Sequence, residues 1–196
     1  MPNPRDIEFL FEVGSLRNMD RGWRQHLATD CANDLEHTVR VAWLALILAR
    51  REGAGDEATI LKMALAHDIC ETRVSDLSYM QKVYVTADEA RAVHDTFDGT
   101  TVSAYEKIVE DFERRDTIEA KLVKDADNLD VDLELKELAE RGHALPAQWK
   151  ETREKVRDEK LYTQAAKDFW DELQAANPAD WHLRSNKWYK VPSAGT

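Results

Sequence analysis

One short stretch of the chain, ALAHDICETRVSDL at residues 64–77, gathers residue types that carry out hydrolytic or metal chemistry. His67 and Asp68 are adjacent, Glu71 follows four residues after His67, and Asp76 lies just beyond. The stretch continues an apolar run, and ionisable side chains on an apolar helix face are costly to bury unless they are paired or bind a metal. The pattern therefore predicts either a mutually satisfied buried His–Asp pair or part of a metal site.

A helix over about residues 56–72, which follows a glycine-rich turn, must position these groups. On such a helix Ala64, His67 and Glu71 share one stripe, because their spacing follows the helical repeat. Asp68 lies on the neighbouring stripe. Both members of the His–Asp pair are therefore predicted to point toward whatever this helix packs on.

Two further helices carry ionisable residues on or beside apolar faces. A helix over about residues 34–51 places His37 one turn before Val41, which begins its apolar stripe. A long helix over about residues 116–141 carries Asp127 on the flank of its apolar face, where an acid is out of pattern. Three other acids of the long helix lack that context and are predicted to lie at the surface or behind the ligands: Asp125, Asp130 and Asp132.

Together the three helices offer two imidazoles and two carboxylates, from His37, His67, Asp68 and Asp127. A mixed set of nitrogen and oxygen ligands suits Mn, Co, Fe, Ni or Zn better than Ca. Four protein ligands leave two positions of an octahedral sphere open, which is typical of catalytic rather than structural metal sites. The set predicts a metal centre with room for one substrate oxygen and one water.

The composition places these helices in an all-α protein. The 196 residues are 33% charged and 43% hydrophobic, with only 7 Gly and 5 Pro, so we expect a single helical domain over residues 1–196. The net charge of −11 argues against duplex nucleic acid as a partner. The two cysteines indicate no disulfide framework and favour a cytoplasmic location. No apolar run is long enough to span a membrane, and the N-terminus lacks the pattern of a signal peptide.

Outside the candidate site, further helices are predicted over about residues 6–14, 87–94 and 101–114, from Pro146, and over about 161–176. The first helix is expected to bury Ile7, Leu10 and Phe11, with Val13 as a further candidate. Residues 16–26 are read as a loop that places Trp23 on the core. The tail aromatic residues, with Trp170, are expected to pack the tail on the body or on a partner subunit: Trp181, Trp188 and Tyr189.

The order H…HD…D, with an acid four residues after the HD histidine, resembles the HD-domain metal-dependent phosphohydrolases. The branch with bacterial 5′-deoxynucleotidases and related small HD proteins is the most similar. The resemblance spans most of residues 9–140, the HD core, and leaves about 146–196 as C-terminal helices and aromatic tail. Its four pieces are GW at 22–23, EHTVRVAWLALILA at 36–49, ALAHDICETRVSDL at 64–77 and EAKLVKDADNLD at 119–130.

The resemblance implies that His37, His67, Asp68 and Asp127 bind the metal, in a helical bundle typical of the family. Dinuclear members use extra histidines between the HD pair and the last aspartate, where this chain has only His94. We therefore expect one divalent ion: Co, Mn, Fe, Ni, Zn or Mg.

The resemblance also implies roles around that metal. Glu71 matches the family's catalytic acid, and Asp76 matches the following acid that supports substrate or water. Arg21 and Trp23 match the arginine and tryptophan on the phosphate side. Because that piece is shorter here than in close relatives, Arg24 could take the role of Arg21.

The roles of three residues that follow the HD pair stay open. Ser75 stands where many relatives have glycine, which leaves the local turn and the substrate fit open. Lys82 and Arg73 are each either a phosphate contact or a solvated charge, and Lys82 is kept as a candidate substrate contact.

The resemblance leads us to expect hydrolysis of a nucleotide phosphate monoester, most of all a 5′-deoxynucleoside monophosphate, by a homodimer. One alternative is the same site acting on nucleoside triphosphates, cyclic nucleotides or alarmones. Another is a nucleotide-binding regulator without catalysis, which the complete ligand set and Glu71 argue against. A purely structural helical protein would leave the buried acids unexplained.

Overall fold

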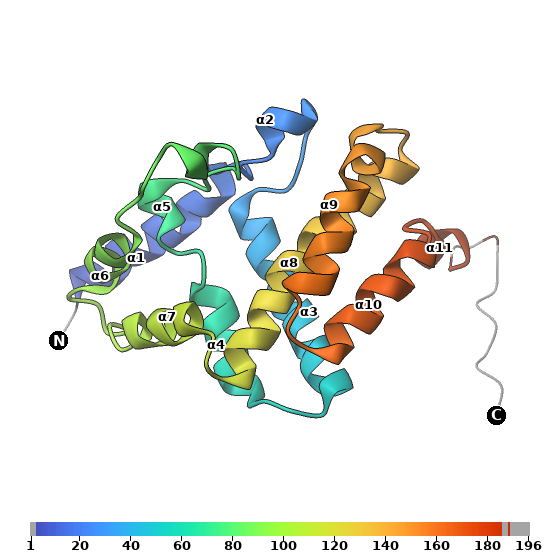
Figure 1. Cartoon of the computed structure of the whole chain (residues 1–196). Helices are drawn as coiled ribbons and strands as arrows, with labels where there is room; N and C mark the ends of the chain where they lie inside the picture. The colour runs from blue at the N-terminus through green and yellow to red at the C-terminus, as the bar shows by residue number, and fades with distance from the viewer. Residues whose placement is uncertain (1–2, 186–187, 189–196) are drawn as a thin grey trace.

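The computed structural model describes residues 3–185 and 188, and within that part the chain forms helices and turns without strands (Figure 1). This confirms the predicted all-α fold. The elements in chain order are α1 (Pro4–Ser15), η1 (Leu16–Asn18), α2 (Arg24–Leu27), α3 (Asp34–Glu52), α4 (Glu57–Ala66), α5 (Glu71–Val74), η2 (Gln81–Val83), α6 (Glu89–Phe97), α7 (Tyr105–Arg114), α8 (Ile118–Glu140), α9 (Leu145–Glu159), α10 (Gln164–Ala175) and α11 (Asp180–Leu183).

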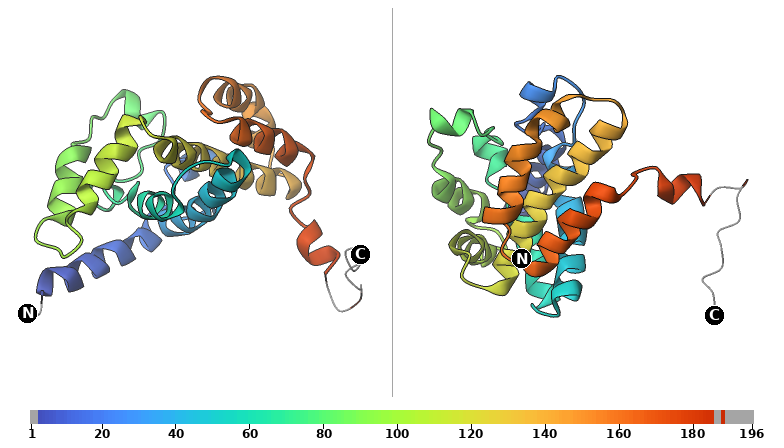
Figure 2. Two further views of the ribbon diagram at one scale, coloured as in Figure 1. Left: turned by 90° about the horizontal axis from the view of Figure 1, so that it is seen from below. Right: turned by 45° about the vertical axis from the view of Figure 1, so that its right-hand side comes forward.

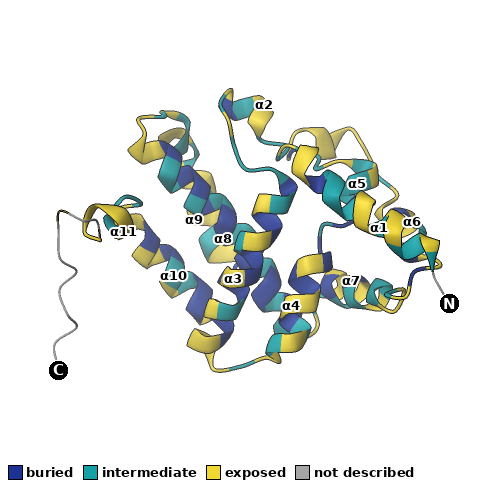
Figure 3. Cartoon of the chain, turned by 180° about the vertical axis from the view of Figure 1, so that it is seen from behind, coloured by how far each residue is buried: buried dark blue, intermediate teal, exposed yellow. Residues whose placement is uncertain are grey.

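The centre of the bundle is formed by α3, α4 and α8, which pack on one another. Helix α3 begins at a capping box between Asn33 and Glu36 and ends at Gly53, whose φ of 70° closes the last turn. Figure 3 shows that buried residues concentrate on these three helices. The main apolar side chains of this core are Val41, Leu44, Leu48, Ile60, Met63, Leu122, Val123 and Leu129.

Two groups of helices flank this centre on opposite sides (Figures 1 and 2). On one side α1, α5, α6 and α7 enclose a second apolar cluster around Phe97 and Leu16. On the other side α9 and α10 pack against α8. The centre is therefore covered from both sides, and the candidate site combines residues of α3 and α8 with the turn that leads from α4 to the first group.

Helix α4 ends at Ala66, not near Thr72 as predicted, so the shared stripe of Ala64, His67 and Glu71 is wrong. At this point the His67 ring Nδ1–H donates to the carbonyl of Ala64 (2.8 Å). The backbone then tightens into bonds between residues three apart, such as Glu71 N–H to Asp68 O (3.0 Å), before the short helix α5. A turn, not a continuous helix, presents the HD pair and Glu71.

The buried side of α1 also differs from the prediction. Of the predicted residues, Val13 packs on the second cluster together with Phe9, whereas Ile7, Leu10 and Phe11 are exposed. Both sets have helical spacing, so the sequence of α1 alone offers two apolar faces and the packing partner selects one of them.

Trp181 does not pack on the body, because it is 77% exposed on a helix that projects from it (Figure 1), and its packing on a partner subunit stays a prediction. Trp170 is buried in α10, and Trp188 is exposed. Tyr189 lies outside the described residues.

Two buried aspartates of α8 hold the C-terminal helices to the core. Asp125 accepts hydrogen bonds from the backbone N–H groups of Tyr162 (2.7 Å) and Thr163 (2.9 Å), just before α10. Asp132 accepts two bonds from the guanidinium of Arg153 in α9 (2.8 and 2.7 Å). The prediction that these two acids lie at the surface or behind the ligands is wrong, because their partners lie in α9 and in the segment before α10, which no local spacing reveals.

Among the helices of the described residues, none is long and apolar enough to cross a membrane.

Candidate metal centre

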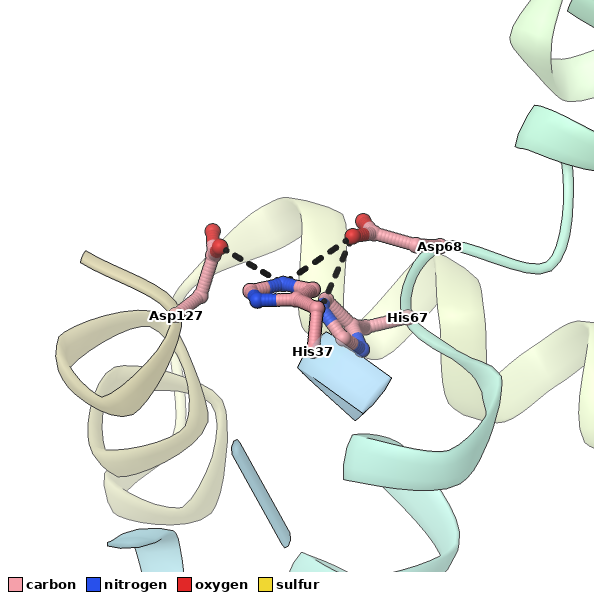
Figure 4. Close-up of side chains that lie close together, drawn as sticks. All are labelled: His37, His67, Asp68 and Asp127. Atoms are coloured by element: carbon pink, nitrogen blue, oxygen red, sulfur yellow. Dashed lines mark hydrogen bonds and ion pairs between the residues drawn. The ribbon is translucent and has the colours of Figure 1, made fainter. Parts of the chain in front are cut away.

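Four side chains from three parts of the bundle converge as the sequence predicts (Figure 4). His67 and Asp68 come from the turn after α4, with His67 Nε2 3.1 Å from Asp68 Oδ2. His37 comes from α3, and its Nε2 lies 3.4 Å from Asp68 Oδ2 and 3.3 Å from Asp127 Oδ1 of α8. One ligand atom of each residue lies within 4.8 Å of the others.

Hydrogen bonds behind the two histidines aim their Nε2 atoms into the cluster. His37 Nδ1–H donates to Asp130 Oδ2 (2.6 Å), and His67 Nδ1–H donates to the carbonyl of Ala64 (2.8 Å). Such outward bonds fix the tautomer that metal-binding histidines require. Of the two alternatives predicted for Asp130, the structure places it behind a ligand and buries it.

The cluster fits a transition-metal ion. Bonds of about 2.0–2.2 Å place neighbouring ligand atoms of a bound ion about 3 Å apart. The separations of 3.1–3.4 Å between the histidine Nε2 atoms and the aspartate oxygens are within a few tenths of an ångström of that value. His37, His67, Asp68 and Asp127 could therefore hold one divalent ion.

Charged neighbours within the cluster shift the pKa values of its side chains. Burial disfavours the ionised carboxylates, but His67 and His37 hold the pKa of Asp68 well below its usual value. Against the same burial, Lys124, whose Nζ lies 2.6 Å from Asp127 Oδ2, lowers the pKa of Asp127. Burial also opposes charge on His37, but its bonds to Asp127 and other aspartates raise its pKa well above the usual value. Metal binding must therefore displace a proton from His37.

A second acidic group adjoins the cluster and surrounds the guanidinium of Arg21. Arg21 Nη1 lies 3.3 Å from Asp76 Oδ2 and 3.4 Å from Asp68 Oδ2. The same nitrogen is 3.6 Å from Asp34 Oδ1 and 4.0 Å from Glu71 Oε2. The side chain of Arg21 is only 11% exposed, so these acids hold a buried cation beside the candidate metal ligands.

These acids do not all ionise together. Burial and the neighbouring carboxylates of Asp68 and Asp76 raise the pKa of Glu71 to about 11. Burial raises the pKa of Asp34 to about 6, although Arg21 opposes the change. A cation bound at the adjacent cluster would favour the ionised form of Glu71.

A close approach of two loops places Arg21 and Trp23 next to Asp76. The backbone N–H of Gly22 donates to Asp76 Oδ2 (2.9 Å). A Cβ at Gly22 would lie only 2.5 Å from the carbonyl oxygen of Asp76, so only glycine fits here. The indole Nε1 of Trp23 is buried and has no hydrogen-bond partner among the described residues.

The structure separates the other candidate cations from this group. Arg24 is exposed and pairs with Asp20 (2.6 Å) and Asp30 (3.1 Å), so Arg21 is the arginine beside the cluster. Lys82 is exposed on η2, and Arg73 pairs with Glu12 of α1 (2.6 Å). Neither Lys82 nor Arg73 is brought to the acidic group in the described part of the chain.

Ser75 ends α5 with φ 66° and ψ 155°, a conformation that costs a non-glycine residue about 1–3 kcal/mol. Its strained backbone directly precedes Asp76, which contacts Arg21 and Gly22. A glycine at position 75, as the family resemblance leads us to expect, would adopt this turn without that cost.

Asp34 and Lys124 were not among the predicted site residues, and Asp130 was predicted to lie either at the surface or behind the ligands. The carboxylate of Asp34 is buried and has no hydrogen-bond partner among the described residues. A usable signal existed on the long helix, where Asp127, Asp130 and Glu134 follow the helical spacing of one face. All three acids contact other parts of the chain.

Comparisons with known proteins place the chain in a family. A family model described as HD domain matches residues 13–176. The 5′-deoxynucleotidase HDDC2 of Dictyostelium discoideum is 27% identical over 152 residues, which cover 71% of this chain and 80% of that protein. The 5′-deoxynucleotidase HDDC2 of Danio rerio is 28% identical over 142 residues, covering 68% of this chain and 70% of the relative.

Solved structures share the fold. A conserved hypothetical protein from Pyrococcus furiosus superposes with a TM-score of 0.73 at 23% identity, over 87% of this chain and 99% of the other. A predicted metal-dependent phosphohydrolase from Magnetospirillum magnetotacticum superposes with a TM-score of 0.69 at 21% identity, over 87% and 92% of the two chains. The chain therefore belongs to the HD-domain family, the metal-dependent phosphohydrolases that its four motifs resemble.

Proposed function

We propose that this protein is a metal-dependent phosphomonoesterase that releases orthophosphate from nucleotides, with 5′-deoxynucleoside monophosphates as preferred substrates. The observation that carries the proposal is the buried guanidinium of Arg21 beside the four candidate metal ligands. A planar guanidinium suits the oxygens of a phosphate group. The 5′-deoxynucleotidase names of two relatives support the choice of substrate.

The balance of charge explains why phosphate binding should require the metal. The two groups contain the carboxylates of Asp34, Glu71, Asp76, Asp68 and Asp127. Without metal, Glu71 is neutral and His37 is protonated, so four carboxylates face three cations: the guanidinium of Arg21, the ammonium group of Lys124 and the imidazolium of His37. A phosphate dianion would be repelled by this excess of acids, since like charges at short range destabilise each other in a buried site. We therefore expect phosphate affinity to appear only with the divalent ion.

The residues then take separate roles in hydrolysis. A divalent ion at the cluster would neutralise charge that develops on the phosphoryl group. Arg21 binds the phosphate oxygens, and Trp23 walls the adjoining pocket. Glu71, ionised next to the cation, accepts the proton of the attacking water, while Asp76 holds the loop of Arg21 in place through the N–H of Gly22 (2.9 Å).

A panel of phosphate esters tests the proposal after the protein has been chelated and reloaded with single divalent metals. We expect orthophosphate release, with 2′-deoxynucleoside monophosphates among the best substrates. Release of pyrophosphate or triphosphate from nucleoside triphosphates, with monophosphates untouched, would overturn the substrate assignment. Metal and nucleotide binding without turnover would instead indicate a regulator, and absence of metal binding would indicate a structural protein.

We also propose a homodimer, formed through the outer face of α3. Val39, Trp43 and Ile47 are exposed there at helical spacing, and Trp43 is 68% exposed. Apolar side chains gathered on one face indicate a contact surface. Light scattering should give twice the chain mass, and Trp43→Glu should give the monomer; a wild-type monomer at micromolar concentration would contradict this assembly.

The free cysteines Cys31 and Cys70 support a cytoplasmic location.

A further inference from the structure

A pocket of about 390 Å³ opens next to the candidate metal centre. Its inner end is formed by Arg21 and Asp76, and its walls come from Trp23, Tyr79 and the α9 residues Trp149 and Arg153. The pocket therefore begins at the guanidinium assigned to phosphate and extends toward the C-terminal part of the chain. None of the motifs that carry the family resemblance lies in α9.

The walls of this pocket are aromatic. The rings of Trp149 and Trp23 stack, with centroids 6.4 Å apart and planes inclined by 21°. Tyr79 meets Trp149 edge to face at 6.2 Å, and His26 packs on both of them. These pairs fix the orientation of the Trp149 ring from several sides.

The aromatic side chains are not fully buried in the core. Trp23 and Trp149 pack partly on the apolar cluster of Leu27, Leu135 and Leu138, yet both also line the open pocket. Tyr79 is 64% exposed at the rim. Apolar rings held at a pocket mouth offer a surface for a flat ligand.

The charges of the pocket disfavour a second anionic group beside its other cation, Arg153. The guanidinium of Arg153 already makes two bonds to Asp132 (2.8 and 2.7 Å) and one to the carbonyl of Asn128 (2.8 Å). The carboxylate neutralises its charge. A chain of further phosphates would therefore find no available cation there, whereas an uncharged ring would find aromatic partners.

We infer that this pocket binds the nucleobase of the substrate, which stacks on Trp149 while the phosphate lies at Arg21. The inference rests on the proposed nucleotide substrate and adds α9 to the substrate-binding residues. Stacking on an aromatic face is available to every base, so Trp149 should contribute affinity without strong preference among bases. Helix α9 would thus distinguish nucleotides from phosphate esters that carry no base.

The experiment compares 2′-deoxyadenosine 5′-monophosphate with 2-deoxyribose 5-phosphate, which lacks the base. For Trp149→Ala, we expect kcat/KM on the nucleotide to fall roughly ten- to a hundredfold, mainly through KM, as for the loss of one base–aromatic stack. Its kcat/KM on 2-deoxyribose 5-phosphate should stay within about threefold of wild type. Trp149→Phe, which keeps a ring, should retain most of the nucleotide activity. Trp181→Ala is the matched control, because this tryptophan lies on the projecting helix α11.

The outcomes separate this inference from the proposed function. Equal losses on both substrates, or no loss on the nucleotide, would overturn the base pocket while leaving phosphatase activity established. If wild type releases no phosphate from any nucleotide, the proposed function fails. Calorimetry with 2′-deoxyadenosine 5′-monophosphate on the metal-loaded protein then still decides the pocket: weaker binding to Trp149→Ala than to Trp149→Phe supports it, and equal binding refutes it. Melting temperatures of all variants confirm that each is folded.

Discussion

Replacing Asp130 by asparagine should weaken metal binding although Asp130 is not itself a ligand. The carboxylate accepts two hydrogen bonds, from His37 Nδ1–H (2.6 Å) and from Arg40 Nε–H. An asparagine side chain has one acceptor and one donor. If its oxygen faces Arg40, its NH₂ group donates to His37 Nδ1 and moves the ring proton to Nε2, where the metal must bind. If its oxygen faces His37, two donors meet at Arg40.

The magnitude follows from the role of such supporting bonds. Loss of the partner behind a metal-binding histidine lowers metal affinity about 10- to 100-fold, or roughly 1.4–2.7 kcal/mol. At saturating metal the stabilisation by the ion falls by the same amount, because binding to the folded state is linked to stability. For a chain of this size the metal-induced rise in melting temperature should shrink by roughly 3–10 °C. Competition with a chromophoric chelator measures the affinity, and thermal unfolding with and without metal measures the rise.

Asp132→Asn is the matched control. Asp132 lies on the same helix, is also buried and also pairs with an arginine, but it contacts Arg153 instead of a histidine. Both variants should unfold at lower temperature without metal, since each loses a charged hydrogen bond. Only Asp130→Asn should lose metal affinity. An Asp130→Asn protein with wild-type affinity, or an Asp132→Asn protein with the same loss, would refute the reasoning.

Three further predictions concern the site. Glu71→Gln should fold and keep its metal but lose roughly 10²–10⁴ in single-turnover phosphate release, and turnover within a few-fold of wild type would remove Glu71 as the acid–base group. Asp127→Ala should lower metal content, measured by elemental analysis, and abolish the metal-induced rise in melting temperature; full occupancy would exclude Asp127 as a ligand. Ser75→Gly should relieve the backbone at φ 66° and raise the melting temperature by roughly 2–4 °C, for a gain of about 1 kcal/mol. An unchanged or lower value would contradict the strain.

The helical fold and the four candidate ligands could be predicted from the sequence for a physical reason. Apolar periodicity is local, so it indicates the helices that became α3 and α8 and marks His37 and Asp127 as ionisable groups beside buried faces. The adjacent His67 and Asp68 need no long-range information to be noticed. The order of these residues then led to the family.

The orientation of these residues depends on tertiary contacts that the local apolar periodicity of the sequence does not reveal. The bond from the His67 ring to the Ala64 carbonyl accompanies the end of α4, so a turn rather than a helix face presents the HD pair. Which face of α1 is buried was likewise decided by its packing partner.

Only the tertiary structure decided which other acids serve the site and which serve the fold. Asp125, Asp130 and Asp132 look alike in the sequence of α8, yet one accepts bonds from the segment before α10, one from His37 and one from Arg153. Burial of a carboxylate requires a partner, and each partner here lies outside α8, at least 21 residues away along the chain. The same holds for the aromatic pocket, because Trp149 of α9 meets Trp23 from a distant part of the chain. Sequence periodicity determined the helices and the candidate ligands, and the packing of distant helices determined what surrounds them.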